Sequence, residues 1–221
     1  MFFNGDSKDN VKVIFSSWSG GKDSALAFFK AKEFFGRVDY IFTMFDENCL
    51  RTRAHGLKPE VIRMQADSIG VKLIHGCASW KGYEEVFSHI LEEYFAGGVG
   101  VFGDIDLQEH LDWIVRVCNN KNVSVFEPLW KREREDIFYE FLQLGFKARV
   151  VSVKKGFEEL MGKELNEDFI ELARKVGADL CGENGEFHTL VYDGPIFSYP
   201  LPIDEIYQMH IEVSNISRSA L

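Results

Sequence analysis

Short apolar runs alternate with longer amphipathic segments over the first 126 residues of the chain. The apolar runs predict buried strands at residues 11–15, 40–45, 71–74, 99–102 and 123–126. The segments between them carry apolar residues at helical spacing and predict helices at residues 23–35, 58–69, 83–95 and 107–118. Strands that alternate with helices form βαβ units, in which helices cover both faces of a parallel sheet. The sequence therefore predicts an α/β fold with a doubly wound parallel sheet.

The pattern changes after Pro128, which ends the last of these strands. Helices are expected at residues 135–144 and 167–176, a strand at residues 147–153, and a loop-rich stretch at residues 181–198. Three of the five prolines fall in the last 27 residues, where extended or edge segments are expected rather than helices. We therefore predict two domains, residues 1–128 and a smaller α+β part at residues 129–221.

The chain has 35 acidic and 25 basic residues, which gives a net charge of −10. An acidic surface repels the phosphate backbone of nucleic acid, so nucleic acid is not expected as a partner. The ten N-terminal residues lack the pattern of a signal peptide, and no apolar stretch reaches the roughly 20 residues that span a bilayer. We therefore expect a cytoplasmic protein with no membrane partner. Its four cysteines form no C-x-x-C pair and are expected to be reduced and buried: Cys49, Cys77, Cys118 and Cys181.

A glycine-containing segment, Ser19-Gly20-Gly21-Lys22-Asp23-Ser24, lies between the first expected strand and the first expected helix. An open parallel sheet binds ligands at this position, outside the carboxyl ends of its strands. Consecutive glycines let backbone N–H groups approach an anion, and the positive end of the helix dipole favours phosphate. The two serines add hydroxyl donors, and Lys22 adds a positive charge. We expect phosphate binding; a plain strand-to-helix turn with Asp23 as the N-cap is the structural alternative.

Asp23 does not suit a pure phosphate cradle, because its carboxylate repels the anion unless Mg²⁺ lies between them. The residue therefore indicates a metal-bound nucleotide, with Asp23 as a metal ligand. A Walker A loop is excluded, because Lys22 would have to be followed by Ser or Thr. The segment resembles the pyrophosphate loop of the N-type ATP pyrophosphatases. That resemblance implies an adenine nucleotide alpha hydrolase-like fold, ATP cleavage between the α- and β-phosphates, and ATP or pyrophosphate binding by residues 19–24 and Gly103.

A second polar segment, residues 182–195, carries Glu183, Asn184, Glu186 and His188 among three glycines. The two glutamates can bind or deprotonate ammonium, or hold Mg²⁺. Asn184 can orient a substrate amide or carboxylate, and His188 can shuttle a proton. A turn with solvated acids is the structural alternative, and the spacing alone does not decide between the two.

The segment Gly182-Glu183-Asn184-Gly185-Glu186-Phe187-His188-Thr189, with its continuation to Pro195, is similar to the C-terminal signature of the diphthine–ammonia ligase family. That family amidates a modified histidine on a translation elongation factor. The resemblance implies an ATP-dependent amidating ligase that activates a carboxylate as an adenylate, releases pyrophosphate and lets ammonia displace AMP. Its ligands would be ATP, Mg²⁺, ammonium and a carboxylate-bearing substrate such as a modified protein side chain.

The same resemblance assigns roles to single residues and to the two predicted domains. Residues 1–128 would bind the nucleotide, and residues 129–221 would bind the substrate. The expected catalytic residues are Asp23, Glu183, Glu186 and His188. The expected substrate-binding residues are His55, Asp104, Asn184 and Thr189.

One segment departs from the family pattern. Confirmed members resemble G-A-I-x-S-x-Y-Q-R-x-R after the fourth strand, whereas residues 103–113 read G-D-I-D-L-Q-E-H-L-D-W. Acids, a histidine and a tryptophan replace the basic groups, so we expect a bacterial or archaeal branch of the family whose acceptor differs. The sequence leaves open whether Asp104 and Asp106 contact metal or substrate, or whether Asp106 caps the following helix.

Other polar groups are interpreted from position alone. Residues 46–48 follow the second expected strand, where adenine or ribose would lie, and residues 51–56 gather Arg53 and His55 on a loop that suits substrate. His110 and Trp113 are expected to pack rather than react. Two other functions fit the glycine segment, a tRNA-modifying enzyme of the same superfamily and a protein that senses ATP without turnover. The acceptor, the ammonia source and the formation of a homodimer stay open.

Overall fold

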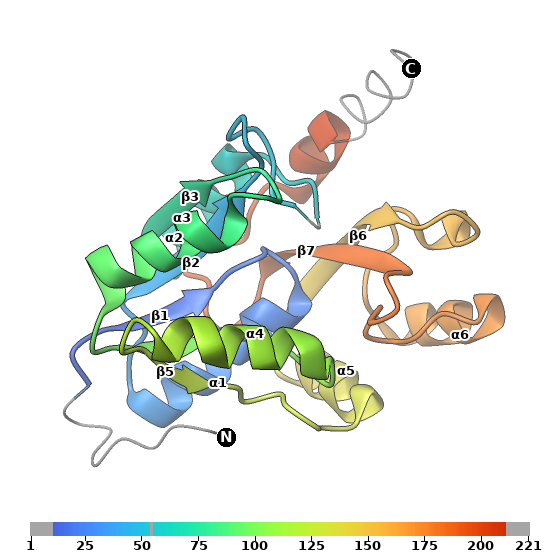
Figure 1. Ribbon diagram of the computed structural model, residues 1–221. Coiled ribbons are helices and arrows are strands. Elements are labelled where there is room, and N and C mark those ends of the chain that lie inside the picture. Colours follow the sequence, from blue (N-terminus) through green and yellow to red (C-terminus); the bar gives the residue numbers. More distant parts are fainter. Residues whose placement is uncertain (1–10, 54, 211–221) are drawn as a thin grey trace.

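The computed structural model describes residues 11–53 and 55–210 (Figure 1). Its first part contains the strands β1 (Ile14–Ser17), β2 (Tyr40–Phe45), β3 (Lys72–Cys77), β4 (Val99–Val101) and β5 (Ser124–Phe126). The helices between them are α1 (Lys22–Phe35), α2 (Pro59–Ile69), α3 (Tyr83–Ile90) with its π-helical continuation η2 (Leu91–Phe95), and α4 (Gln108–Asn119). The strands lie in the order β3-β2-β1-β4-β5, and all pairings are parallel. The predicted doubly wound α/β sheet is confirmed.

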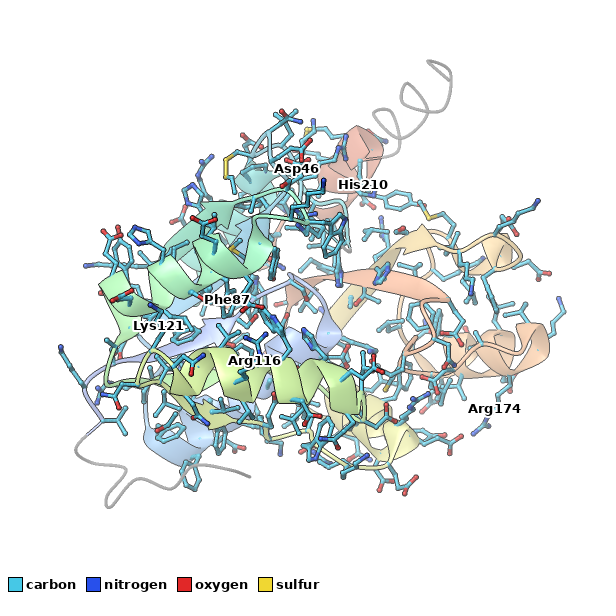
Figure 2. The ribbon with its side chains drawn as sticks, in the orientation of Figure 1. Asp46, Phe87, Arg116, Lys121, Arg174 and His210 are labelled. Carbon is cyan, nitrogen blue, oxygen red and sulfur yellow. A yellow bond between two sulfur atoms is a disulfide. The ribbon has the colours of Figure 1, made fainter. Side chains whose placement is uncertain are left out.

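Residues along each strand alternate between two apolar cores, one on each face of the sheet. Ile14 packs with buried residues of α1 and α2, whereas its neighbour Phe15 packs with those of α3 and α4. The second core is rich in aromatic rings, and the ring centroids of Phe15 and Phe95 lie 4.1 Å apart. Phe87 extends this cluster from α3 (Figure 2), with its ring centroid 5.1 Å from that of Phe42. Phenylalanine therefore fills much of the space between the sheet and its outer helices.

The second part of the chain combines helices with a small antiparallel sheet. Its elements are α5 (Arg134–Gln143), β6 (Lys147–Val153), the 3₁₀ turn η3 (Glu158–Leu160), α6 (Glu167–Val176) and β7 (Phe187–Asp193). Strands β6 and β7 pair with each other, beside the large sheet (Figure 1). Residues 203–210 form a further helix. The α+β character predicted for this part is confirmed.

Two local predictions for this part are wrong. Residues 187–193 form strand β7 rather than a loop, because most of their side chains are buried and their backbone pairs with β6. Residues 203–210 are helical although prolines precede them. Pro202 lies just before this helix, where its carbonyl accepts a hydrogen bond from Ile206 N and its missing N–H leaves no helical bond unmade.

The two parts share one apolar core on the α1–α2 face of the large sheet. Buried residues of α5, α6 and β7 belong to the same cluster as those of α1 and α2. Phe29 of α1 packs edge-on against Phe146, with the two ring centroids 6.1 Å apart. The division into domains at residues 128 and 129 stays a prediction. The shared core brings β7 alongside the start of α1.

The large sheet has its topological switch point between β1 and β4. These strands are neighbours, and the chain proceeds from them towards opposite edges of the sheet. Such a reversal opens a crevice at the carboxyl ends of the two strands, where doubly wound folds bind their ligands. The glycine segment, residues 19–24, follows β1, and Gly103 follows β4. The fold therefore places both on one crevice.

The prediction that all four cysteines are reduced is wrong for one pair. Cys49 and Cys77 form a disulfide, with their Cα atoms 5.3 Å apart. Spacing along the sequence hides this contact, because the parallel pairing of β2 with β3 creates it by placing Phe45 opposite Cys77. Cys118 and Cys181 are free and buried. No helix in the described part of the chain is both long and apolar enough to cross a membrane, and the ten N-terminal residues lie outside that part.

Candidate active site

Two glycines let the loop after β1 lie close to its neighbours. Gly20 has a φ of +86°, and a Cβ there would lie 2.7 Å from Leu57 Cδ1. Gly103 packs against the first turn of α1, and a Cβ there would lie 2.9 Å from the Asp23 carbonyl oxygen. Any other residue at Gly103 would push the end of β4 away from the loop. Both positions therefore require glycine for packing, and Gly20 requires it for conformation as well.

Strand β7 holds the glycine loop in place from the other side. The Gly20 carbonyl accepts hydrogen bonds from Val191 N at 2.9 Å and from Gln65 Nε2 at 3.1 Å. Gln65 Nε2 also donates to the Val191 carbonyl at 2.7 Å. Thr189 Oγ1 accepts a hydrogen bond from Lys22 N at 3.1 Å, at the start of α1. Residues of the C-terminal signature thus pack against the glycine loop and hold it by hydrogen bonds.

The N-terminus of α1 is free of the cap expected in the structural alternative. Gly21 is the N-cap residue, without a side-chain cap, and Asp23 is the second residue of the helix. Ser24 Oγ donates to the Gly21 carbonyl at 2.9 Å and lies 3.1 Å from Ser19 Oγ. The N–H groups of a first helical turn have no acceptor within the helix and carry a partial positive charge. This end of α1 is suited to an anion.

Lys22 and Asp23 form a tight ion pair. Lys22 Nζ donates to both carboxylate oxygens of Asp23, at 2.7 and 2.6 Å, and the lysine side chain is only 3% exposed. Burial alone would lower the pKa of Lys22, but the Asp23 carboxylate outweighs it and holds that pKa above its ordinary value. Lys22 is therefore positively charged at all pH values at which the protein would work.

A cavity of about 360 Å³ opens in front of the loop. It is lined by Lys22, Asp23, His55, Asp104, Leu107, Cys181, Gly182, Glu183, Gly185, Phe187, His188 and Thr189. The fold thus brings the glycine segment and the C-terminal signature together, although 167 residues separate Lys22 from Thr189. Seven predicted site residues do not line the cavity: Ser19, Gly20, Gly21, Ser24, Gly103, Asn184 and Glu186.

Glu183 is an acid of this cavity that can change its charge near neutral pH. Burial, and after it the nearby Asp23 carboxylate, raises the pKa of Glu183 to about 7, despite the positive charges of Lys22 and Arg134. A group with such a pKa can both accept and release a proton at pH 7. Glu183 therefore has the properties of a general base or acid.

Two imidazoles, His55 and His188, face the same cavity, and their ring centroids are 4.9 Å apart. Burial, and then the neighbouring His188, lowers the pKa of His55 to about 3. Burial, and then Lys22, also lowers the pKa of His188. Because His55 Nδ1 lies 2.7 Å from the Thr189 carbonyl, a neutral ring donates its proton there and leaves Nε2 as an acceptor.

Glu186 braces the loop that carries Glu183. Its carboxylate accepts hydrogen bonds from Asp179 N at 3.1 Å and from the backbone and side-chain nitrogens of Asn184, both at 3.0 Å. Burial would raise the pKa of Glu186, but these hydrogen bonds outweigh it and lower that pKa. Glu186 is only 4% exposed and stays charged to hold the turn. Asn184 and Glu186 thus fix the loop behind the cavity.

The two acids after β4 have protein partners. The Asp104 carboxylate contacts His110 Nδ1, and this hydrogen bond raises the pKa of His110. Asp106 accepts hydrogen bonds from Arg134 at 2.9 and 3.0 Å. The N-cap of α4 is Leu107, so the alternative that Asp106 caps this helix is wrong. Within the described ranges, no group of three or more His, Cys, Asp or Glu residues is arranged to hold a metal ion.

Glu127 is a buried acid that the sequence reasoning missed. It directly follows β5 and is 2% exposed. Its Oε2 accepts a hydrogen bond from Asp104 N at 3.3 Å, and its Oε1 has no hydrogen-bond partner among the described residues. Burial, and then the Asp104 charge, raises the pKa of Glu127 well above its ordinary value. The available signal was an acid immediately after a buried strand, at the ligand-binding edge.

The loop between β2 and α2 contributes His55 to the cavity, and its other described polar side chains do not line the cavity. Asp46 Oδ1 accepts a hydrogen bond from Leu50 N at 2.8 Å, so it closes a turn of the loop itself. Residues 46–48 do not line the cavity. His210, from the last described helix, lies near the same loop (Figure 2), since a Cβ at Gly56 would lie 3.5 Å from its Cε1 atom.

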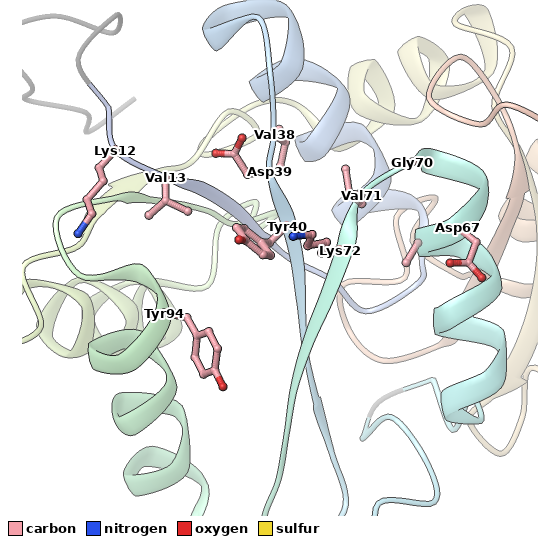
Figure 3. A pocket seen from close by; sticks show the side chains of 11 residues that line it. Lys12, Val13, Val38, Asp39, Tyr40, Asp67, Gly70, Val71, Lys72 and Tyr94 are labelled. Carbon is pink, nitrogen blue, oxygen red and sulfur yellow. The ribbon is translucent and has the colours of Figure 1, made fainter.

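A larger cavity, of about 770 Å³, lies at the opposite edge of the sheet (Figure 3). Its lining includes Lys12, Asp39 and Lys72, which lie at the amino ends of the strands. Doubly wound sheets bind ligands at the carboxyl ends, and this cavity holds no residue of the two polar segments. We therefore take the smaller cavity as the candidate active site.

Comparison with known proteins finds two family models that match this chain. The family model for the diphthamide synthase N-terminal domain matches residues 11–125, and the model for the diphthamide synthase C-terminal domain matches residues 133–219. The chain is 31% identical to the human diphthine–ammonia ligase over 97 residues, which are 41% of this chain and 36% of that protein. It is 28% identical to the zebrafish (Danio rerio) diphthine–ammonia ligase over 126 residues, which are 54% of this chain and 49% of that protein.

The matches thus span about a third to a half of the length of these relatives. Among solved structures, a predicted subunit of tRNA methyltransferase from Methanocaldococcus jannaschii is 17% identical, with a TM-score of 0.46, and covers 80% of this chain and 95% of its own. The two family models together match most of the described residues. The two matched segments contact each other where the glycine loop lies against β7. The chain belongs to the diphthamide synthase family.

Proposed function

We propose that the protein is an ATP-dependent ligase that joins ammonia to a carboxylate and forms an amide. The observation that carries the proposal is the presence of Lys22, Asp23 and Glu183 in one cavity at the switch point. Lys22 and Asp23 come from the segment that resembles a pyrophosphate loop, and Glu183 comes from the C-terminal signature. The relatives are named diphthine–ammonia ligases, which supports ammonia as the nitrogen donor and makes diphthine the first acceptor to test.

The residues at this cavity fit ATP and Mg²⁺. The start of α1 combines the N–H groups of Asp23 and Ser24, which have no acceptor within the helix, with the charge of Lys22, and together these suit a phosphate chain. Asp23 supplies carboxylate oxygens, the ligand type that Mg²⁺ prefers. Mg²⁺ usually takes one or two carboxylates and completes its shell with phosphate oxygens and water. One carboxylate is therefore within the usual protein contribution, and Glu183 is not needed as a ligand.

In the proposed reaction, the acceptor carboxylate attacks the α-phosphorus of ATP, and the bond from that phosphorus to the pyrophosphate oxygen breaks. Lys22 and the N-terminus of α1 stabilise the negative charge of the departing pyrophosphate. Ammonia then attacks the acyl carbon, and AMP leaves with the electron pair of the carbon–oxygen bond. Glu183 accepts the proton that the nitrogen loses, because its pKa of about 7 lets it act as a base at neutral pH.

The other cavity residues orient these groups. His188 is neutral at pH 7, because burial and Lys22 lower its pKa, and it can relay the proton from the site. His55 and Thr189 hold each other and the start of α1, so they fix the position of the phosphates. Positioning, charge stabilisation and proton transfer are the contributions that this chain makes to the reaction.

The test supplies ATP, magnesium chloride, ¹⁵N-labelled ammonium chloride and an elongation factor that carries diphthine. We expect AMP and pyrophosphate to form in step with ¹⁵N in the acceptor, measured by ion-exchange chromatography and mass spectrometry. Glu183→Gln should lower kcat by about 100-fold or more, because the base is lost. Glu171→Gln, an exposed position on α6, is the matched control and should leave kcat unchanged. Formation of ADP and phosphate instead of AMP and pyrophosphate would contradict the proposal.

A further inference from the structure

A second pocket, of about 420 Å³, lies at the carboxyl edge of the sheet and has mostly aromatic walls. It is lined by Arg53, Trp80, Tyr83, Glu84, His110 and Trp113. These residues come from the loops that follow β2 and β3 and from helices α3 and α4. The Trp80 side chain is 76% exposed, so one aromatic wall is open to a ligand.

This aromatic pocket adjoins the cavity of about 360 Å³ in front of the glycine loop, here called the catalytic cavity, along two elements. Arg53 lines the aromatic pocket, and His55, two residues later on the same loop, lines the catalytic cavity. On the other side, His110 of the aromatic pocket contacts the Asp104 carboxylate of the catalytic cavity. A ligand in the aromatic pocket is therefore separated from the catalytic cavity by a single layer of side chains.

Arg53 is the positive charge of the pocket. Its guanidinium carbon lies 4.2 Å from the centroid of the Trp80 ring and 5.6 Å from that of Tyr83. One terminal nitrogen donates to the Ala78 carbonyl, whereas Nε is buried and has no hydrogen-bond partner among the described residues. A buried donor without an acceptor is costly, and a ligand oxygen would relieve that cost.

Glu84 does not neutralise Arg53, because its carboxylate is already occupied. It accepts hydrogen bonds from Arg116 at 2.7 and 2.8 Å and from Trp113 Nε1 at 2.8 Å. Arg116 lies on α4, which faces α3 across this contact (Figure 2). Among the described residues that line the pocket, Arg53 is therefore the cation without a carboxylate partner, and it lies beside aromatic walls. Its charge attracts a carboxylate.

We infer that this pocket binds the acceptor of the ligase, and that the acceptor combines a planar ring with a carboxylate. The ring lies against Trp80 and Trp113, and the carboxylate accepts hydrogen bonds from Arg53. Arg53 then determines specificity by holding the carboxylate at the boundary with the catalytic cavity. This inference rests on the proposed function, because it supplies the substrate of the same reaction.

The test measures binding of 4-fluorophenylacetate to the full chain by ligand-observed ¹⁹F NMR, without ATP or ammonium. The neutral isostere 4-fluorophenylacetamide separates the carboxylate from the ring. We expect the acid to bind at least about tenfold more tightly than the amide, since a hydrogen bond to a charged group is worth that much. Equal affinities, or no binding of the acid up to its solubility limit, would overturn the inference.

Variants assign the two parts of the ligand to their residues. Arg53→Gln should remove the preference for the acid, and Arg53→Lys should keep part of it, because Lys retains the charge without the planar fork. Trp80→Leu should weaken acid and amide alike. The matched controls are Arg63→Gln and Tyr199→Leu, which alter exposed side chains outside the pocket and should change neither affinity. Thermal unfolding of every variant shows whether the fold is kept. An unchanged preference in folded Arg53→Gln would overturn the inference.

The outcome is separable from that of the proposed function. Binding of the acid with no AMP release in the ligase assay would contradict the proposed reaction and leave the pocket assignment in place. Amide formation on the diphthine acceptor that Arg53→Gln leaves at the wild-type KM would contradict the pocket assignment and leave the reaction in place.

Discussion

At the scale of single residues, Glu183 has a local environment that favours its neutral form. It is half-buried beside Asp23, and Lys22 compensates only part of the resulting repulsion. The same property that suits Glu183 for proton transfer makes its ionisation unfavourable for folding. Function and stability therefore oppose each other at this residue.

We predict that Glu183→Gln stabilises the protein at high pH and not at low pH. The folded-state pKa of about 7 lies above the ordinary value of 4.5, so the folded state holds this proton more tightly. Its contribution to stability is present below pH 4.5 and is lost as the pH rises through 7. The variant, which does not titrate, should gain about 1–3 kcal/mol in free energy of unfolding relative to wild type between pH 4 and pH 8. Urea unfolding at both pH values measures this. A difference that does not change with pH would refute it.

The sequence predicts which residue types form the site, but it does not predict the role of each residue. Gly20, Gly21 and Glu183 stand out by composition and position alone. The Glu186 carboxylate accepts hydrogen bonds from Asn184 and Asp179. This arrangement depends on the shape of a turn, which the spacing of residues along the sequence does not reveal. Glu127 was overlooked because nothing in the sequence shows that an acid after β5 is buried.

At the scale of elements, strand β7 and the glycine loop form one structural unit. Thr189 Oγ1 accepts the Lys22 N–H, and Val191 N donates to the Gly20 carbonyl. The geometry of the loop is therefore set partly by a strand from the other end of the chain. A substitution in β7 should therefore alter phosphate binding through the geometry of the loop.

We predict that Thr189→Val weakens both folding and ATP binding. Valine has nearly the same shape but lacks the hydroxyl, so the buried Lys22 N–H loses its acceptor. The expected loss is about 1–3 kcal/mol in free energy of unfolding, measured by urea titration. Isothermal titration calorimetry with ATP and Mg²⁺ should show weaker binding of ATP, because the start of α1 is no longer held by this hydrogen bond. Thr189→Ser keeps the hydroxyl and is the control. Equal stability of the valine and serine variants would refute the prediction.

Sequence patterns identified the helices and parallel strands of the large sheet and failed at β7 and at residues 203–210. The parallel strands are buried on both faces and read as continuous apolar runs. Strand β7 follows a turn rich in Gly and Glu, and this turn masks its pattern. The final helix is hidden because Pro202 looks like a helix breaker until its place just before the helix is known.

At the scale of the whole molecule, the two parts of the chain are joined by a common core. Buried residues of α1 and α2 pack with those of α5, α6 and β7 on one face of the sheet. The βαβ order predicts the sheet and its switch point, since parallel crossovers have few alternatives. It does not predict where the second part packs, because no local pattern encodes that contact. The Cys49–Cys77 disulfide is hidden for the same reason.

We predict that the chain unfolds in one cooperative transition, despite the two parts that its sequence suggests. Removal of residues 129–221 would expose the apolar face of α1 and α2, so residues 1–128 alone should aggregate or stay unfolded. Differential scanning calorimetry checks the first point by comparing the calorimetric with the van 't Hoff enthalpy. Two resolved transitions, or a soluble and cooperatively folded fragment 1–128, would show that the parts are independent.

The contact of Thr189 with the start of α1 has a consequence for biosynthesis. A nascent chain leaves the ribosome from its N-terminus, so the glycine loop emerges long before the strand that completes it. Until residues 189–191 have cleared the exit tunnel, the loop lacks its partners at Gly20 and Lys22. The polypeptide should therefore acquire its affinity for nucleotide only after β7 has been made, long after the loop itself has emerged.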